Sequence, residues 1–187
     1  LAELIDEAGV PAGVYNVVHG GADAALALLE HPDIKGATFV GTTAIGRDVV
    51  YKKCGETGKR AIVQAAAKNF MVVMPDANVE ATIPALLTSF FGNSGQRCLA
   101  GANLVIVGDD AFYTRFLDTF AAAASKIRVG YGLDESIQMG PMQSTDGKKR
   151  VLSYIEKGIK EGARLLLDGR KPKINGTYPD TCFVNPT

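Results

Sequence analysis

Apolar positions along the chain follow two spacings in turn, and this alternation predicts a succession of strands and helices. Runs of β-branched and other apolar residues predict strands, and apolar residues three or four apart predict helices. The predicted helices cover residues 1–8, 22–30, 44–53, 79–92, 111–126 and 145–161. The predicted strands cover residues 14–18, 37–40, 61–64, 70–74, 104–107, 127–129, 164–167 and 182–184. Strands alternating with helices are typical of an α/β protein with open, mostly parallel sheets and helices on both faces.

Three features refine this pattern. Pro84 falls in a predicted helix, where a proline is tolerated only near the first turn because it lacks an N–H group. Residues 171–177, which contain Pro172 and Gly176, predict a turn-rich surface loop. At the start of the same predicted helix as Pro84, Asn78 has a side chain that can cap the helix, and Glu80 is an acid that favours its first turn.

The composition is that of an ordinary globular protein, with 47% hydrophobic and 21% charged residues among 187. The charges of twenty basic and twenty acidic residues cancel, so the chain lacks the net positive charge that is typical of a nucleic-acid-binding protein. No apolar run has the length of a membrane span, so no membrane partner is expected. The sequence opens without Met inside a predicted helix and ends just after a predicted strand, so we expect a piece of a larger protein.

The chain has three cysteines, Cys54, Cys98 and Cys182, with no CxxC spacing, and only two histidines. A zinc site is therefore not expected, and the predicted site contains no metal. Cys54 and Cys182 lie in a predicted helix and a predicted strand, and we interpret both as core residues. The odd number of separated cysteines favours a reducing compartment, the cytoplasm or, in a eukaryote, the mitochondrial matrix.

Cys98 stands apart because a loop of small residues, 92–96, and then Arg97 precede it, and the run Leu104–Val107 follows. One interpretation is structural, since a free cysteine usually behaves as a small buried hydrophobe. The other is chemical, because the thiolate is the nucleophilic form and a neighbouring cation favours it. The cysteine alone does not decide between them.

Residues 41–46 follow a predicted strand and open a predicted helix, the place where backbone N–H groups favour a phosphate. Arg47-Asp48 stands where a P-loop needs Lys followed by Ser or Thr, and Thr43 breaks a GxGxxG pattern. A plain strand-to-helix turn explains this segment as well as an anion site does. The hydroxyls of Thr42 and Thr43 could either cap the helix or hold a phosphate.

Taken together, the segments resemble the aldehyde dehydrogenase superfamily along the whole chain. FVGTTAIG, residues 39–46, resembles the family's NAD pyrophosphate turn, and GQRC, residues 95–98, its catalytic cysteine motif. GVPAGVYNVV (9–18), MGP (139–141) and FVNPT (183–187) fit as well. The resemblance implies the C-terminal part of an NAD-binding domain in residues 1–69 and the N-terminal part of a catalytic domain in residues 70–187.

The resemblance also implies roles for single residues. Cys98 is the expected catalytic nucleophile, whose backbone N–H partly holds the oxyanion, and Arg97 the expected substrate-binding residue. The residues expected to bind the cofactor NAD are Gly41, Thr42, Gly46 and Ala65. Arg97 suits the carboxylate of a semialdehyde, and a structural ion pair with an acid on a neighbouring segment is its alternative.

Within the family the likeness is greatest to the CoA-acylating methylmalonate-semialdehyde dehydrogenases. It rests on AKN (67–69), VMPDAN (73–78), GQRC and SYIEKG (153–158). It implies that a small aldehyde is oxidised with NAD through a cysteine thiohemiacetal and thioester, and that CoA takes the acyl group. The expected partners are this aldehyde and CoA, and the full-length enzyme is expected to be a homo-oligomer, a dimer or a tetramer.

Gln64 bears on the last step of this reaction. In hydrolytic family members a segment similar to Glu-Leu-Gly-Gly-Lys begins with a glutamate, and this glutamate activates the water that cleaves the thioester. The corresponding segment here is Gln64-Ala65-Ala66-Ala67-Lys68, and an amide cannot act as a general base. Its absence favours thiolysis by CoA over hydrolysis. The alternatives are a hydrolytic NAD(P)-dependent enzyme whose base was lost, and an inactive structural or interaction piece in which Gln64 is only a strand end.

Overall fold

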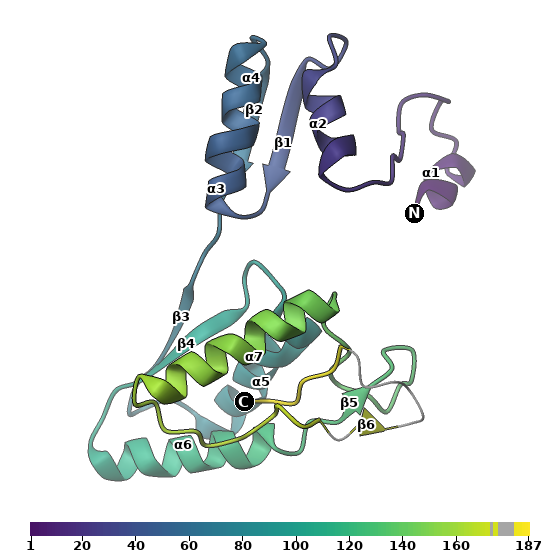
Figure 1. The fold of residues 1–187 in the computed structure, drawn as a ribbon. Helices are drawn as coiled ribbons and strands as arrows, with labels where there is room; N and C mark the ends of the chain where they lie inside the picture. Colours follow the sequence, from purple (N-terminus) through teal and green to yellow (C-terminus); the bar gives the residue numbers. More distant parts are fainter. Residues whose placement is uncertain (173, 176–181) are drawn as a thin grey trace. The chain divides into compact units, whose positions relative to one another are not determined.

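The computed structural model describes residues 1–172, 174–175 and 182–187. The chain forms two compact units, Leu1–Ala66 and Ala67–Thr187. The units are described separately below, and Figure 1 gives the course of the chain through each. Whether they correspond to parts of a cofactor-binding and a catalytic domain stays a prediction.

The first unit is built around a parallel pair of strands, β1 (Gly36–Val40) and β2 (Arg60–Gln64). A continuous helical crossover joins them, formed by α3 (Thr43–Ile45), a π-helical segment η1 (Gly46–Tyr51) and α4 (Lys52–Glu56). Two helices precede β1, α1 (Ala2–Glu7) and α2 (Ala22–Glu30). The register runs from Gly36 opposite Arg60 to Val40 opposite Gln64, so both strands end at the same edge.

One face of this small sheet carries the core of the unit. Leu29, Val50 and Cys54 are buried against alternate strand residues, among them Phe39 and Val63. The intervening strand residues point the other way, so Val40 and Ile62 remain more than 60% exposed. The interpretation of Cys54 as a core residue is confirmed.

The second unit contains a parallel pair, β3 (Asn69–Val73) and β4 (Gly101–Ile106), joined through α5 (Val79–Phe91) and a 3₁₀ turn, η2 (Gly92–Gly95). The helices α6 (Asp110–Ala124) and α7 (Thr145–Lys160) follow. A second parallel pair is short, β5 (Val129–Gly130) with β6 (Ile174–Asn175). The α/β class and the parallel pairing predicted from the sequence are confirmed.

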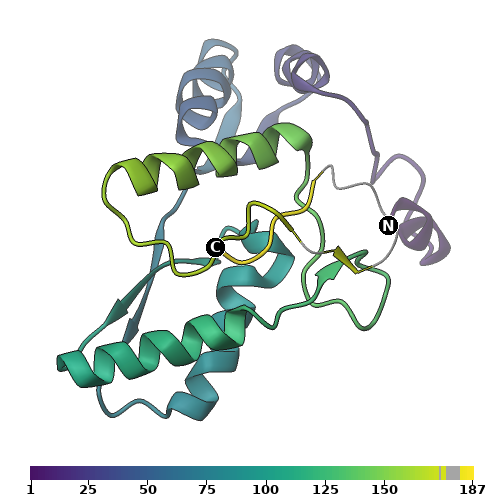
Figure 2. The ribbon, with the colours of Figure 1, turned by 60° about the horizontal axis from the view of Figure 1, so that its bottom comes forward.

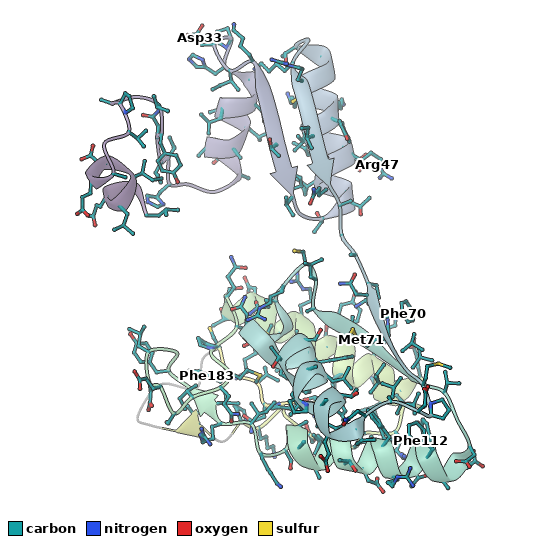
Figure 3. All side chains as sticks on the ribbon, turned by 180° about the vertical axis from the view of Figure 1, so that it is seen from behind. Asp33, Arg47, Phe70, Met71, Phe112 and Phe183 are labelled. Atoms are coloured by element: carbon teal, nitrogen blue, oxygen red, sulfur yellow. The ribbon has the colours of Figure 1, made fainter. Side chains whose placement is uncertain are left out.

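The helices α5 and α6 lie side by side and cover one face of β3 and β4 (Figure 2). The core there consists of Val73, Ile83, Leu86, Phe112 and Phe116. Figure 3 shows Met71 and Phe70 on opposite sides of β3; Met71 packs against this core, and Phe70 is 63% exposed. None of the helices in the described part of the chain is long and apolar enough to cross a membrane.

The start of α5 agrees with its sequence. The side chain of Asn78 caps the helix by accepting a hydrogen bond from the Ala81 N–H over 3.1 Å, and Glu80 lies in the first turn. Pro84 is the sixth residue of the helix, beyond the first turn where the sequence rule tolerates it. Its side chain is exposed, so the ring does not disturb the core. The carbonyl of Glu80 lacks the helical hydrogen bond from residue 84, because proline has no N–H group.

Several predicted strands are wrong. Residues 14–18, 164–167 and 182–184 form no strand, although each run is largely apolar. A strand is stable only beside a partner, and the described residues provide no neighbour for these segments. The loop predicted at 171–177 contains the short strand β6, and the rest of it lies partly outside the described residues. Cys182 is therefore not a strand residue, and its side chain is only partly buried.

Candidate functional site

The turn after β1 is fixed by two backbone hydrogen bonds. The N–H of Gly41 donates to the carbonyl of Gln64, at the end of β2, over 3.1 Å. The N–H of Gly46 donates to the carbonyl of Thr42 over 3.0 Å and starts the helix. Thr42 is the N-cap residue, but its side chain makes no capping hydrogen bond. Its hydroxyl and the first N–H groups of a 14-residue helix (residues 43–56) are thus left to face an anion.

Close packing explains both glycines of this turn. A Cβ atom on Gly41 would lie 2.5 Å from Cζ of Phe39, and one on Gly46 would lie 2.5 Å from Cγ1 of Val63. Both distances are far shorter than a carbon–carbon contact allows. The helix can therefore begin directly against the strands only where these two side chains are missing.

Arg47, the first cationic residue after the turn in the sequence, is paired with its neighbour Asp48. Arg47 Nε and Nη2 donate to the two carboxylate oxygens of Asp48 over 2.6 and 2.8 Å. This guanidinium holds the pKa of Asp48 below its usual range. With Arg47 neutralised by its neighbour, an anion at this turn would be bound by backbone N–H groups and the Thr42 hydroxyl rather than by a side-chain charge.

An apolar cavity of about 460 Å³ opens beside the same helix. Its wall includes Leu29 from α2, Phe39 from β1, and Ile45 and Val49 from the helix. Ile45 lies three residues after Thr42, so the cavity adjoins the turn. Ala65 follows directly after Gln64, whose carbonyl accepts the Gly41 hydrogen bond. The first unit therefore brings together all four residues predicted to bind the cofactor.

In the second unit, Cys98 is exposed on a tight turn that immediately precedes β4. The N–H of Ala100 donates to the carbonyl of Arg97 over 3.1 Å and closes the turn around Cys98 and Leu99. Burial of the kind expected for a structural cysteine is not found. An exposed thiol on the turn before a strand is accessible to a reactant.

The backbone N–H of Cys98 is also available. In a trans peptide the C=O and N–H groups point in opposite directions. Because the Arg97 carbonyl points into the turn toward Ala100, the Cys98 N–H points out of it. No acceptor for this N–H occurs among the described residues, which leaves it free to bind an oxyanion.

The loop before the cysteine has an unusual backbone. Asn93, Ser94 and Gly95 all have left-handed conformations, with φ of 54°, 54° and 70°. Side chains of the loop hold it: Asn93 Nδ2 donates to the Gln96 carbonyl over 3.1 Å, and Ser94 Oγ donates to the Gly140 carbonyl over 2.6 Å. Left-handed non-glycine residues are strained and cluster at functional sites.

Arg97 is exposed and lies beside Cys98 in the turn. Its guanidinium folds back over Gly92, where a Cβ atom would lie only 2.7 Å from Nη1. Among the residues that the structure describes, no acid forms an ion pair with Arg97. The structural ion pair considered from the sequence is therefore not found, and the positive charge remains available to a ligand.

One residue of this site was missed from the sequence. Asn69 Nδ2 donates to the carbonyls of Cys98 and Ala100 over 2.8 and 3.0 Å, across 29 and 31 residues of chain. In the sequence it stood out only as the last residue of the AKN segment (67–69), just before the predicted strand 70–74, and no role was predicted for it. Within the described part of the chain no cluster of His, Cys, Asp or Glu side chains has the arrangement of a metal site.

Comparison with known proteins identifies the family of this chain. A model of the aldehyde dehydrogenase family matches residues 1–187. Malonate-semialdehyde dehydrogenase from Bacillus velezensis is 45% identical over all 187 residues, and the enzyme from Bacillus subtilis strain 168 is 42% identical. The chain spans 37% of the length of each of these two relatives.

The chain is also similar to solved structures over nearly its whole length. Methylmalonate-semialdehyde dehydrogenase from Oceanimonas doudoroffii matches 98% of the chain with a TM-score of 0.90 and 36% identity. PnpE in complex with nicotinamide adenine dinucleotide matches 99% of it with a TM-score of 0.89 and 35% identity. The chain covers 37% of each of these structures.

Proposed function

Because the chain belongs to the aldehyde dehydrogenase family, we propose that it forms part of an NAD-dependent enzyme that oxidises a small, carboxylate-bearing semialdehyde and transfers the acyl group to CoA. The observation that carries this proposal is the state of Cys98. Its thiol is exposed, its backbone N–H has no acceptor in the described chain, and hydrogen bonds on both sides fix its turn.

The chemistry at Cys98 begins with its thiolate. The sulfur attacks the carbonyl carbon of the aldehyde, a C–S bond forms, and the π electrons of the carbonyl move to its oxygen. The Cys98 N–H then holds this oxyanion. Loss of hydride from the carbon leaves an acyl group bound to the sulfur as a thioester.

NAD, when bound, supplies the acceptor for that hydride. The first unit fits such a cofactor, because the turn at Gly41 and Thr42 presents N–H groups and a hydroxyl to a phosphate. Gly46 lets the helix start close to β2, and Ala65 follows the strand end that holds the turn. The apolar cavity beside Ile45 and Val49 would suit a flat base.

Arg97 would bind the substrate carboxylate. Its exposed guanidinium has no acid partner in the described chain and can donate two parallel hydrogen bonds to the two oxygens of a carboxylate. The names of the relatives support a substrate of this class, since malonate semialdehyde and methylmalonate semialdehyde both carry a carboxylate. Because Arg97 is next to Cys98 in the chain, its charge would also favour aldehydes whose carboxylate lies at a matching distance from the carbonyl.

Release of the acyl group depends on position 64. Gln64 has an amide where a base would be needed to activate water, so a water molecule receives little help there. The thiolate of CoA is already a nucleophile, and its attack on the thioester carbon returns Cys98 as a thiolate. We therefore favour CoA over water as the acyl acceptor.

Product analysis of the full-length enzyme tests the proposal. With malonate semialdehyde and NAD we expect rapid product formation only in the presence of CoA, and the product should be an acyl-CoA thioester. Cys98→Ala should abolish NADH formation and leave NAD affinity within about twofold. Free acid formed equally fast without CoA would point instead to a hydrolytic enzyme, and turnover in Cys98→Ala would end the covalent mechanism.

A further inference from the structure

We propose that Asn69 is a positioning residue that aims the Cys98 N–H at the oxyanion, an inference that rests on the proposed function. Asn69 is half-buried at the start of β3. Both hydrogens of its amide nitrogen are used, one on the Cys98 carbonyl and one on the Ala100 carbonyl. No other residue in the described chain bonds to the Cys98 carbonyl.

The turn needs such a contact because side-chain burial does not hold it. Arg97, Cys98 and Leu99 are all exposed, and Leu99 is 84% exposed. The first residue of the turn that packs into the interior is Ala100. Hydrogen bonds alone therefore determine how the three preceding peptide groups are oriented.

An amide suits this task better than other small side chains. The two carbonyls flank Leu99, and only a group with two donors on one nitrogen can bind both at once. With the amide reversed, its oxygen would face two carbonyl oxygens, so the hydrogen-bond pattern determines the orientation of the side chain. Asn69 thereby links Cys98 to the rigid strand β3.

The sheet is adapted to this contact. Asn69 pairs with Gly101, but its neighbour Phe70 pairs with Asn103, so Ala102 bulges out of β4. The Gly101 N–H donates to Ser89 Oγ over 2.9 Å instead of continuing the ladder. Bulges commonly re-aim a chain next to an active site. Here the bulge places the turn directly opposite Asn69.

The consequence concerns one bond in the reaction. Asn69 fixes the carbonyl of Cys98, and Ala100 fixes the carbonyl of Arg97, so the peptide groups on both sides of the Cys98 Cα are held. The direction of the Cys98 N–H is then set before the substrate arrives. When sulfur attacks the aldehyde, the oxygen that gains the electron pair meets a donor that needs no rearrangement.

The test uses Asn69→Leu and Asn69→Ala in the full-length enzyme. We expect the single-turnover rate of NADH formation to fall about 10- to 100-fold in Asn69→Leu, because small misalignments of a catalytic group cost this much. Asn69→Ala should lose less, since water can enter and replace the donors. The matched control is Asn103→Leu, the same change on the neighbouring strand, where the side chain has no hydrogen-bond partner among the described residues; it should keep the wild-type rate.

A second measurement separates positioning from simple collapse of the loop. Iodoacetamide alkylates a thiolate without forming an oxyanion, so its rate at Cys98 should stay within about threefold in both Asn69 variants, and NAD affinity should not change. An unchanged NADH rate in both variants would overturn the proposal. A parallel loss of alkylation, NAD affinity and thermal stability would also overturn it, because Asn69 would then be structural. Activity retained by Cys98→Ala would instead contradict the proposed function itself.

Discussion

The guanidinium of Arg97 lies directly over the Cα of Gly92, at the point where α5 ends. A Cβ atom on Gly92 would be 2.7 Å from Nη1 and 3.0 Å from Cζ of Arg97. Gly92 has φ of −56° and ψ of 130°, so the backbone alone does not require glycine here. The missing side chain provides the space in which the arginine rests, and this relationship yields two predictions on substrate binding.

Arg97→Leu should impair the oxidation of carboxylate-bearing aldehydes selectively. Loss of a charge-assisted bidentate contact costs roughly 2–4 kcal/mol, which corresponds to roughly 30- to 1000-fold in kcat/KM. The measurement compares malonate semialdehyde with a neutral aldehyde of the same size, which should lose little. Equal losses on both substrates would assign Arg97 a structural role.

Gly92→Ala should produce a weaker effect of the same kind. The new methyl group displaces the guanidinium without removing its charge, and the end of the arginine side chain can move aside. We expect KM for malonate semialdehyde to rise about 3- to 10-fold, and kcat for the neutral aldehyde to stay near wild type. If Gly92→Ala matched Arg97→Leu on both substrates, displacement of Arg97 would not explain it.

Gln64→Glu should raise the formation of free acid in the absence of CoA. A carboxylate at this position can deprotonate the water that attacks the thioester, and a gain of about 10- to 100-fold is reasonable for general base catalysis. Gln64→Ala is the control, because it supplies no base and should give no gain. A failure of Gln64→Glu to increase acid formation would show that position 64 does not face the acyl-enzyme.

Gly46→Ala should destabilise the first unit. The added methyl group would lie 2.5 Å from the stiff side chain of Val63, and overpacking of this kind costs about 1–3 kcal/mol in the free energy of unfolding. NAD affinity should fall as well, because the turn must shift. Gly55→Ala, later in the same helix, is the control: no atom lies within 4 Å of its added Cβ, so this change should be neutral or stabilise by up to about 1 kcal/mol. Urea unfolding and calorimetry with NAD give both quantities, and equal unfolding free energies for the two variants would contradict the packing argument.

Below about pH 4 the second unit should lose the stability that Asp168 contributes at higher pH. Arg170 donates to Asp168 and also to Glu156 on α7, and it lowers the pKa of Asp168 from 3.8 to about 2. A carboxylate with a lowered pKa stabilises the folded state above its ordinary pKa and loses this effect as the pH falls through the lower value. Asp168→Asn should therefore lower the melting temperature at pH 5–7, and the difference from wild type should vanish between about pH 4 and pH 2. A difference that persisted unchanged at pH 2 would show that the ionised pair is not its cause.

Local sequence was sufficient for features whose parts lie close together in the chain. The strand-to-helix turn after β1, whose binding of an anion stays a prediction, needs only a strand end, Gly41, Thr42 and a helix start, and the cap at Asn78 needs only residues 78–81. Both were predicted in the right place. The glycine at position 46 is explained only by Val63, which lies 17 residues further along the chain.

Features that depend on distant partners could not be predicted. The segments 14–18 and 164–167 have the composition of strands, but composition does not supply the neighbouring strand that a ladder requires. The contact between Asn69 and Cys98 spans 29 residues and depends on a bulge at Ala102, which no periodicity signals. The sequence therefore pointed to Cys98 as the expected nucleophile, and it did not point to Asn69, whose side chain bonds to the turn around Cys98.

The left-handed backbone at Asn93 and Ser94 restricts how this loop can evolve. Left-handed conformations cost most L-residues roughly 1–2 kcal/mol, and asparagine and glycine tolerate them best. At position 93, glycine would relieve the backbone, although it would give up the bond to Gln96. At position 94 the demands conflict, because glycine would fit the backbone while only a short hydroxyl side chain makes the 2.6 Å bond to Gly140. Threonine keeps the hydroxyl, but its β-branch opposes φ of 54°. Random mutagenesis should therefore find position 94 among the least tolerant in the chain, even though its side chain takes no part in the chemistry.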